Sequence, residues 1–180
     1  VGQWYVRFAQ EAAKSEEIGK QLEQEAQDML LRWEQGDQEV TTLWERMNSW
    51  AYEGWNETYH RLRFKIDKDY YESQTYQGGK EIVMQGLEKG LFQKDERGAV
   101  IVDLTDKRLD KKVLLRSNGT AVYITQDINL ARLRADDFSF HEMIYVVGNE
   151  QEYHFKVLFE IFRMLGYSFA DRCKHFSYGM

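Results

Sequence analysis

The chain has 180 residues, a formal net charge of -6 and one cysteine, Cys173, and it is long enough for one domain with a hydrophobic core. The negative charge argues against a dominant nucleic-acid surface, and the single cysteine excludes an internal disulfide framework and is typical of a cytoplasmic protein. No apolar run approaches the roughly 20 residues that a membrane-spanning helix needs.

Two amphipathic helices are predicted in the first segment, residues 1–63. Apolar residues recur at steps of three and four from about Phe8 to Trp33, and Gly36 is the expected end of this helix. Asp37 is expected to cap a second helix, whose apolar stripe reaches Trp55. We expect the two stripes to pack together as an antiparallel helical hairpin.

The middle segment, residues 64–117, is predicted to be a connective insertion with short strands and one helix. Phe64–Asp67 alternates like a strand, and a short helix is expected from Gly79 to Lys89. The apolar runs Ala99–Asp103 and Val113–Arg116 predict two further strands. The charged stretch between them, residues 106–112, is typical of a solvated loop.

The last segment, residues 118–180, alternates strand and helix signals, which is the pattern of an α/β fold. Asn118-Gly119 predicts a type I′ turn that pairs Val113–Ser117 with Thr120–Ile124, before a helix that begins near Thr125 or Asp127. The apolar run Met143–Val147 predicts a strand buried on both faces. A helix from Glu150 to about Leu165 and a last strand at Arg172–Phe176 follow it.

Polar side chains gather where two of these strand-to-helix turns are predicted. Tyr123, Thr125 and Asp127 belong to the first turn, and Gln151 and His154 belong to the second. In an open parallel sheet, ligands bind in the crevice beyond the carboxyl ends of the strands. The two turns are therefore the candidate functional site.

Each of these residues has a functional and a structural interpretation. An ionised Asp127 in a crevice can take a planar guanidinium in a two-point contact, whereas the structural alternative is a helix N-cap. The amide of Gln151 suits the ammonium or carboxylate group of an amino acid, and the alternative is a solvated helix residue. Gly148 would allow a ligand to approach the backbone, and His154 and His175 could line the same pocket or be structural.

Two kinds of site are not indicated. The four histidines are widely spread and form no ligand pair, so no metal site is predicted. The chain also has no glycine-rich dinucleotide fingerprint and no phosphate-binding lysine loop.

An ordered set of segments, which together span nearly all of residues 40–180, resembles one known family. The segments are Trp44–Met47 with Tyr59, Asp67–Ser73, Arg97–Val100, Arg116–Thr120, Tyr123–Ile128, Tyr145–Gly148, Gln151–Phe155, Leu165-Gly166 and His175–Met180. In this order they resemble the class I arginyl-tRNA synthetases. That family joins arginine to tRNA with ATP in a catalytic domain of the Rossmann type.

The resemblance implies roles for individual residues. Tyr123 and Asp127 would hold the arginine side chain, and Gln151 would contact the amino acid. On the ATP side, the implied residues are Gly148 and Glu150 near the ribose, His154 in support of that pocket, and the segment from His175 through Gly179 and Met180 beside the adenine. ATP is the implied co-substrate, with Mg²⁺ in the parent enzyme, and the implied partners are L-arginine and tRNA(Arg).

The chain also departs from the family's pattern. It lacks the His-Ile-Gly-His-type and Lys-Met-Ser-Lys-type signatures that handle the phosphates of ATP, and Gln126 stands where the family often has arginine. With Val1 at its start and no tail after Tyr178, it is expected to be an internal fragment of the catalytic domain, containing the second half of the Rossmann-like fold and inactive alone. The alternative is a stand-alone, non-catalytic module that senses arginine or binds a protein partner.

Overall fold

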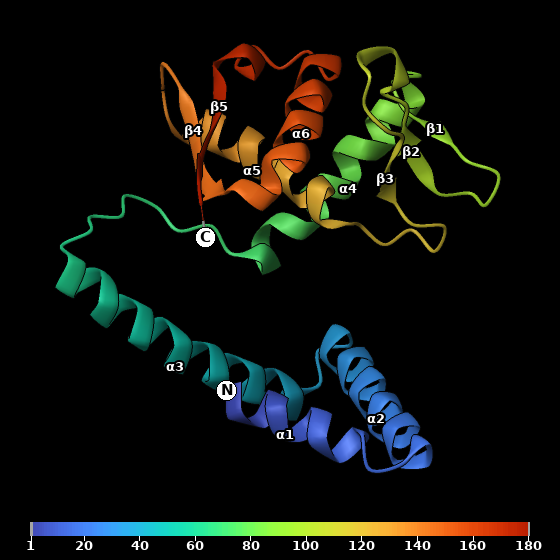
Figure 1. Ribbon diagram of the computed structural model, residues 1–180, viewed down its shortest axis with the longest axis vertical. Helices are drawn as coiled ribbons and strands as arrows, with labels where there is room; N and C mark the ends of the chain where they lie inside the picture. Colours follow the sequence, from blue (N-terminus) through green and yellow to red (C-terminus); the bar gives the residue numbers. More distant parts are fainter. Residues whose placement is uncertain (1, 180) are drawn as a thin grey trace. The chain divides into compact units, whose positions relative to one another are not determined.

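The computed structural model describes residues 2–179, which form two compact units, Val1–Asp67 and Lys68–Met180. The first unit is helical and the second mixes helices with two small sheets (Figure 1). Within the described residues, no helix is both long enough and apolar enough to span a membrane. The two units are described separately below.

The first unit contains three helices, α1 (Gly2–Ala12), α2 (Glu16–Glu34) and α3 (Gln38–Leu62). The prediction of one helix from Phe8 to Trp33 is wrong, because α1 ends at Ala12 and a separate helix, α2, begins at Glu16. Ser15 adopts an extended backbone there, and its hydroxyl accepts a hydrogen bond from the Ile18 amide at 3.2 Å. Serine in this role satisfies an unpaired amide at a helix start, so it ends one helix and begins the next.

The turn between α2 and α3 follows the prediction. Gly36 has a φ of +77°, a conformation that favours glycine, and the Asp37 side chain caps α3 by accepting from the amides of Glu39 and Val40. Trp33 and Trp44 pack with their ring centroids 5.4 Å apart. The predicted hairpin packing is confirmed near this turn only.

Further along α3 the apolar stripe is open to solvent. Trp50 and Trp55 are 53% and 55% exposed, although they continue the stripe to which Trp44 belongs. Val40 is the buried apolar residue of the described part of this unit. The short connection, held by the Arg32–Asp37 ion pair at 3.0 Å, brings together the last turns of α2 and the first turns of α3.

The second unit begins with an extended segment and α4 (Glu72–Glu88). The strand predicted at Phe64–Asp67, just before this unit, does not form, since no described strand pairs with it. Helix α4 starts before Gly79, the position expected from the sequence. The segment before α4 is anchored to Asp137, the last residue of α5 (Tyr123–Asp137). The Tyr70 hydroxyl donates to Asp137 Oδ2 at 2.6 Å, and Lys68 pairs with the same carboxylate.

A three-stranded antiparallel sheet follows α4. It consists of β1 (Gln93–Lys94), β2 (Val100–Val102) and β3 (Lys112–Leu115), in the order β1-β2-β3, with the short 3₁₀ helix η1 (Thr105–Lys107) between the last two. The strands predicted at Ala99–Asp103 and Val113–Arg116 are confirmed. All of Val100–Val102 is buried, as a strongly apolar strand requires.

The turn at Asn118-Gly119 differs from the prediction. Gly119 has a φ of +79°, but Asn118 is not left-handed, so the turn is not type I′. The Asn118 side chain instead accepts from the Thr120 amide at 3.1 Å. Beyond the turn only the bridge between Leu115 and Ala121 forms, because the chain enters the next helix at Tyr123.

The rest of the chain supplies two helices and a two-stranded parallel sheet. The elements are α5 (Tyr123–Asp137), β4 (Met143–Gly148), the 3₁₀ helix η2 (Asn149–Gln151), α6 (Glu152–Met164), the 3₁₀ helix η3 (Ala170–Arg172) and β5 (Cys173–Tyr178). Strand β4 is not buried on both faces as predicted. Ile144 and Val146 are 56% and 63% exposed, because in the described residues helices cover one face of this sheet.

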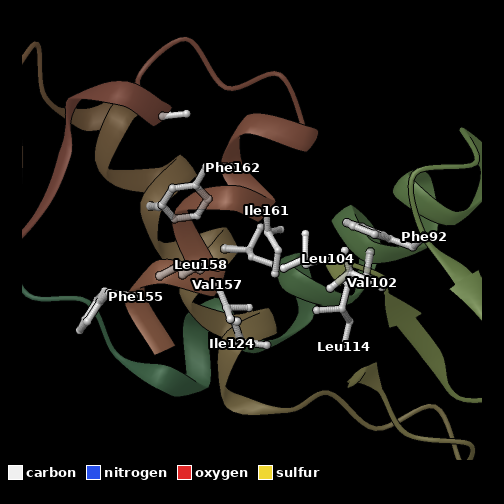
Figure 2. Packing of buried hydrophobic residues seen from close by; sticks show 14 of the residues in the cluster. Phe92, Val102, Leu104, Leu114, Ile124, Phe155, Val157, Leu158, Ile161 and Phe162 are labelled. Carbon is white, nitrogen blue, oxygen red and sulfur yellow. The ribbon is translucent and has the colours of Figure 1, made fainter. Parts of the chain in front are cut away.

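Helix α6 lies at the centre of the core of this unit. Its Val157, Leu158, Ile161 and Phe162 are at most 1% exposed and pack toward Ile124 of α5 (Figure 2). Leu104, Leu114 and Val102 extend the same cluster to the antiparallel sheet. Full burial of one such side chain stabilises the fold by about 1.5–3 kcal/mol, so α6 holds the two sheets and α5 in one body.

Helices α4 and α5 approach closely at two glycines. A Cβ atom at Gly78 would lie 2.6 Å from Asn129 Nδ2, and one at Gly79 would overlap the backbone carbonyl of Thr125. Asn129 is buried and donates from Nδ2 to the Thr75 carbonyl at 2.8 Å. The position of the first turns of α5 therefore depends on missing side chains in α4.

Candidate functional site

The predicted polar residues converge on one open pocket of the second unit. The pocket has a volume of about 380 Å³, and its lining residues are Lys112, Val122, Tyr123, Ile124, Asp127, Gln151 and His154. Four of these residues, Tyr123, Asp127, Gln151 and His154, are those that the sequence places at the two strand-to-helix turns. The two turns therefore meet, as expected.

The start of α5 is fixed by a buried hydrogen bond. Thr125 is fully buried, and its hydroxyl donates to the carbonyl oxygen of Leu114 in β3 at 2.5 Å. Tyr123 and Asp127 are four residues apart and so lie on the same face of the helix. Thr125 points to the core, and the other two line the pocket.

Tyr123 and Asp127 differ in their surroundings. Tyr123 is the first residue of α5 and is 80% exposed. Asp127 lies in the second turn of the helix, and Val122 occupies the N-cap position, so the interpretation of Asp127 as an N-cap is wrong. The side chain of Asp127 is about one third exposed and is directed at His154 of α6.

Asp127 and His154 form a direct contact between α5 and α6. His154 Nε2 lies 2.8 Å from Asp127 Oδ2, and the imidazole is 22% exposed. Because a carboxylate can only accept, Nε2 carries the hydrogen and donates it. The described residues place no hydrogen bond on Asp127 Oδ1, so this oxygen remains available at the pocket.

Gln151 reaches the pocket from the turn after β4. It ends the 3₁₀ helix η2 and occupies the N-cap position of α6, where its side chain makes no capping hydrogen bond. The residue is exposed, and its amide offers both a donor and an acceptor to a ligand.

Lys112 lines the pocket but was not identified from the sequence. It belongs to the charged stretch 106–112, which the pattern assigned to a solvated loop, and it lies at the start of β3. The loop before it is attached to α6, because the Tyr153 hydroxyl donates to Asp110 Oδ2 at 2.6 Å and accepts from the Asp110 amide at 2.9 Å. Lys112 lines the pocket because this loop is attached to α6, a tertiary contact that the charge pattern of the sequence does not show.

The residues that the resemblance assigns to ATP lie mainly at the carboxyl end of the parallel sheet. Gly148 ends β4 and pairs in register with Tyr178 of β5, so Gly148 and Gly179 are near each other. The carboxylate of Glu150 lies against Gly148, where a Cβ atom would overlap its oxygens. These residues do not line the pocket described above.

His175 lies in β5 beside Tyr145, and Met180 lies outside the described residues. His175 Nε2 donates to the Val147 carbonyl at 2.9 Å, and its ring packs on Phe155 with centroids 4.4 Å apart. The histidine therefore links β5 to β4 and to α6.

Tyr145 of β4 contacts side chains of both α6 and α5. Its ring packs on the Phe155 ring with the centroids 4.9 Å apart. The guanidinium carbon of Arg134 lies over the Tyr145 ring, 5.6 Å from its centroid. Burial raises the pKa of Tyr145 well above its usual range, and the negative charge of Asp127 acts in the same direction. The phenol therefore remains neutral at physiological pH.

The pocket offers Asp127 to a cationic group of a ligand and Lys112 to an anionic group. Asp127 presents a negative group in the pocket, Tyr123 a ring, and Gln151 a neutral polar group. No group of three or more His, Cys, Asp or Glu side chains in residues 2–179 could hold a metal ion. The arrangement is thus suited to charge and shape recognition of an organic cation.

Comparison with known proteins gives a single family. Residues 2–180 match the family model described as tRNA synthetases class I (R), catalytic domain. The chain is 57% identical over 156 residues to an arginine–tRNA ligase of Parabacteroides distasonis, which covers 87% of this chain and 26% of the relative. It is 53% identical over 181 residues to that of Treponema denticola, covering 100% of the chain and 30% of the relative.

Two solved structures share the fold. Arginyl-tRNA synthetase from Plasmodium falciparum superposes with a TM-score of 0.72 at 16% identity, covering 89% of this chain and 28% of that one. The Thermus thermophilus enzyme gives a TM-score of 0.68 at 21% identity, with 99% and 35% covered. The chain therefore spans about a third or less of the length of the relatives it matches.

Proposed function

The chain belongs to the family of class I arginyl-tRNA synthetase catalytic domains, and from this we infer that it carries the arginine-binding part of an enzyme that joins L-arginine to tRNA(Arg). The proposed reaction has two steps. L-Arginine and ATP first form arginyl-adenylate and release pyrophosphate. The arginyl group then passes to a ribose hydroxyl at the tRNA end, and AMP is released. Both belong to the whole enzyme, of which this chain is a part.

The observation that carries the proposal is the convergence of Tyr123, Asp127 and Gln151 on one pocket. We assign the Asp127 carboxylate to the guanidinium of L-arginine, because a planar fork of N–H donors matches a carboxylate with a free edge. Tyr123 would flank the aliphatic part of the substrate. Gln151 would contact its ammonium or carboxylate group.

Lys112 adds a positive charge to the same pocket. Both substrates carry negative groups, the carboxylate of arginine and the phosphates of ATP. We assign Lys112 to the attraction of these groups, since a lysine ammonium acts as a compact point charge. Its charge, together with that of Asp127, gives the pocket two ends of opposite sign.

The ATP side is proposed at the carboxyl ends of β4 and β5, where ligands of parallel sheets bind. The residues assigned to it are Gly148, Glu150, His154, His175, Gly179 and Met180. His154 lies between the two sides because it lines the arginine pocket and contacts Asp127. Mg²⁺ would arrive bound to the phosphates of ATP, since no described cluster of side chains offers it a site of its own.

The proposed catalysis depends on positioning and charge. Holding L-arginine and ATP in one geometry converts their encounter into an intramolecular reaction, and no covalent enzyme intermediate is needed. The His-Ile-Gly-His-type and Lys-Met-Ser-Lys-type signatures do not occur in residues 1–180. We therefore expect the 180-residue chain alone to be inactive.

The proposed organisation follows the same assignment. Residues 1–63 would form the helical segment, residues 64–117 the connective insertion, and residues 118–180 the second half of the Rossmann-like fold. The parallel pair β4 and β5, with α6 packed on β5 and α5 packed on α6, supports this last assignment.

The test is ATP–pyrophosphate exchange catalysed by the full-length protein in the presence of tRNA(Arg). We expect exchange that depends on L-arginine and is absent with the other amino acids. Exchange that depends on another amino acid would overturn the substrate assignment. The 180-residue chain, measured in parallel, should give no exchange.

A further inference from the structure

We propose that His154 is a positioning residue for the recognition of the guanidinium group. It would act by holding the carboxylate of Asp127 in one orientation. The inference rests on the proposed function, because it assumes that Asp127 meets the side chain of L-arginine. It moves the main role of His154 from the ATP side of the site to the arginine side.

The first observation is the geometry of the contact. His154 Nε2 donates to Asp127 Oδ2 at 2.8 Å, across the interface between α5 and α6. Oδ1 carries no hydrogen bond from the described residues. The histidine thus occupies one side of the carboxylate and leaves the other side to the pocket.

The second observation is the support behind the imidazole. The His154 ring stands edge-on to Phe155, at 5.4 Å and 86°. Phe155 is 6% exposed and is held in turn by the rings of Tyr145 and His175 (Figure 2 shows Phe155 at the edge of the core). The His154 imidazole is therefore packed against one ring, that of Phe155, which two further rings hold in place.

The third step concerns what the orientation does. A carboxylate rotates about the bond to its Cβ atom, and a hydrogen bond on one oxygen fixes that rotation. A guanidinium makes its two parallel hydrogen bonds only if the carboxylate plane is correctly oriented, whereas the ammonium of lysine is a point charge with rotatable donors. Fixing Asp127 should therefore favour L-arginine over L-lysine.

A role of His154 on the ATP side, a purely structural role and a positioning role can be distinguished by measuring the KM of each substrate separately. A residue of the ATP side would affect the KM of ATP, and a residue that merely stabilises the fold would affect all parameters together. A positioning residue for Asp127 should affect the KM of L-arginine selectively. It should also affect L-arginine more than L-lysine, which can be measured as an inhibitor of exchange.

The experiment uses the full-length protein with tRNA(Arg) and the variants His154→Ala and His154→Gln. We expect His154→Ala to raise the KM of L-arginine by about tenfold, the scale of one hydrogen bond to a charged group, while the KM of ATP stays unchanged. The inhibition constant of L-lysine should rise less. His154→Gln should recover most of the loss, because its amide nitrogen can donate to Asp127 from a similar position.

His141→Ala is the matched control, since His141 is exposed and precedes β4, at the end of the strand opposite to the pocket. It should behave like the unmodified protein. An increase in the KM of ATP equal to that of L-arginine, an equal loss for L-lysine, or no recovery in His154→Gln would each overturn the inference. If the unmodified protein shows no arginine-dependent exchange, the proposed function itself fails, and this outcome is recognised before any variant is measured.

Discussion

The hydroxyl of Thr125 donates to the carbonyl oxygen of Leu114 at 2.5 Å and fastens the first turn of α5 to β3. The bond is fully buried, and it lies between the two pocket residues Tyr123 and Asp127. A core hydrogen bond thus sets the position of the pocket wall.

Thr125→Val replaces the buried hydroxyl by a methyl group of similar size. The carbonyl of Leu114 then loses this partner, which should destabilise the fold by about 1–3 kcal/mol. Urea denaturation, monitored by circular dichroism, measures the change in the free energy of unfolding. Thr125→Ser keeps the hydroxyl and should lose less stability, and equal losses in the two variants would contradict the role of the hydrogen bond.

Gly79→Ala introduces a methyl group where α4 meets the backbone of Thr125. A backbone carbonyl cannot move aside as a side chain can, so we expect a loss of about 1–3 kcal/mol in the free energy of unfolding. Gly54→Ala is the control, because a Cβ atom at Gly54 meets nothing within 4 Å. The control should be neutral or stabilised by up to about 1 kcal/mol, since alanine is the better helix former.

Asp127→Asn removes the negative charge of the pocket and keeps its shape. We expect the KM of L-arginine in the exchange reaction to rise about tenfold to a hundredfold, the scale of a hydrogen bond to a charged group, with little change in the KM of ATP. Asp136→Asn is the matched control on the same helix, where the carboxylate pairs with Arg132 at the surface. An unaltered KM in Asp127→Asn would refute the assignment of the guanidinium.

Lys112→Met keeps the aliphatic length and removes the charge at the start of β3. Binding of the substrates through their negative groups, the carboxylate of L-arginine and the phosphates of ATP, should weaken several-fold, by about 1 kcal/mol. The effect should shrink at high salt, where charges near the surface are screened. Lys111→Met is the neighbouring control, since Lys111 pairs with Asp103 at 2.9 Å. A loss of the same size in both variants would indicate a general charge effect and not a pocket residue.

The acid stability of the second unit should depend on Asp103. Hydrogen bonds from the Thr105 hydroxyl, from Lys111 and from the Thr105 amide lower the pKa of Asp103 to about 2. A folded-state pKa below the unfolded value means that the stabilisation is complete above about pH 4 and is lost as the pH falls towards 2. The carboxyl is exposed, so the effect is modest.

Urea titrations at neutral pH and near pH 2 would measure this dependence. The difference in stability between the unmodified protein and Asp103→Asn should be largest at neutral pH and should shrink in acid. Asp106→Asn, in the same exposed loop, serves as the control. A difference that stays constant with pH would show that the Asp103 contacts do not depend on its charge.

Local patterns in the sequence predict many of the elements. Asp37 caps α3, the apolar runs form β2, β3 and β4, and α6 begins close to the expected residue. These signals are short-range, because capping and strand-forming side chains act on neighbouring backbone groups. The break at Ser15 is also a local capping signal, which the spacing of the apolar residues did not reveal. The strand expected at Phe64–Asp67 fails because no described strand pairs with it.

The sequence predicts several of the pocket residues, but the reason it gives for their meeting is not the one that the structure shows. Tyr123 and Gln151 were expected to meet at the edge of one parallel sheet, but the strand before Tyr123 belongs to the antiparallel sheet and the strand before Gln151 to the parallel pair. Their helices, α5 and α6, bring them together by packing. The Asp127–His154 contact and the position of Lys112 depend on that packing, which no local pattern encodes.

The division of the chain into two units has a practical consequence for spectroscopy. Its five tryptophans, Trp4, Trp33, Trp44, Trp50 and Trp55, all belong to the first unit, and the second unit has tyrosine and phenylalanine as its aromatic residues. Indole fluorescence is therefore a natural label of the helical unit, and the second unit, which contains the pocket, has no tryptophan of its own. A tryptophan placed at position 123 would give the pocket an optical signal of its own, so that ligand binding and unfolding of the helical unit could be followed as separate events in one sample.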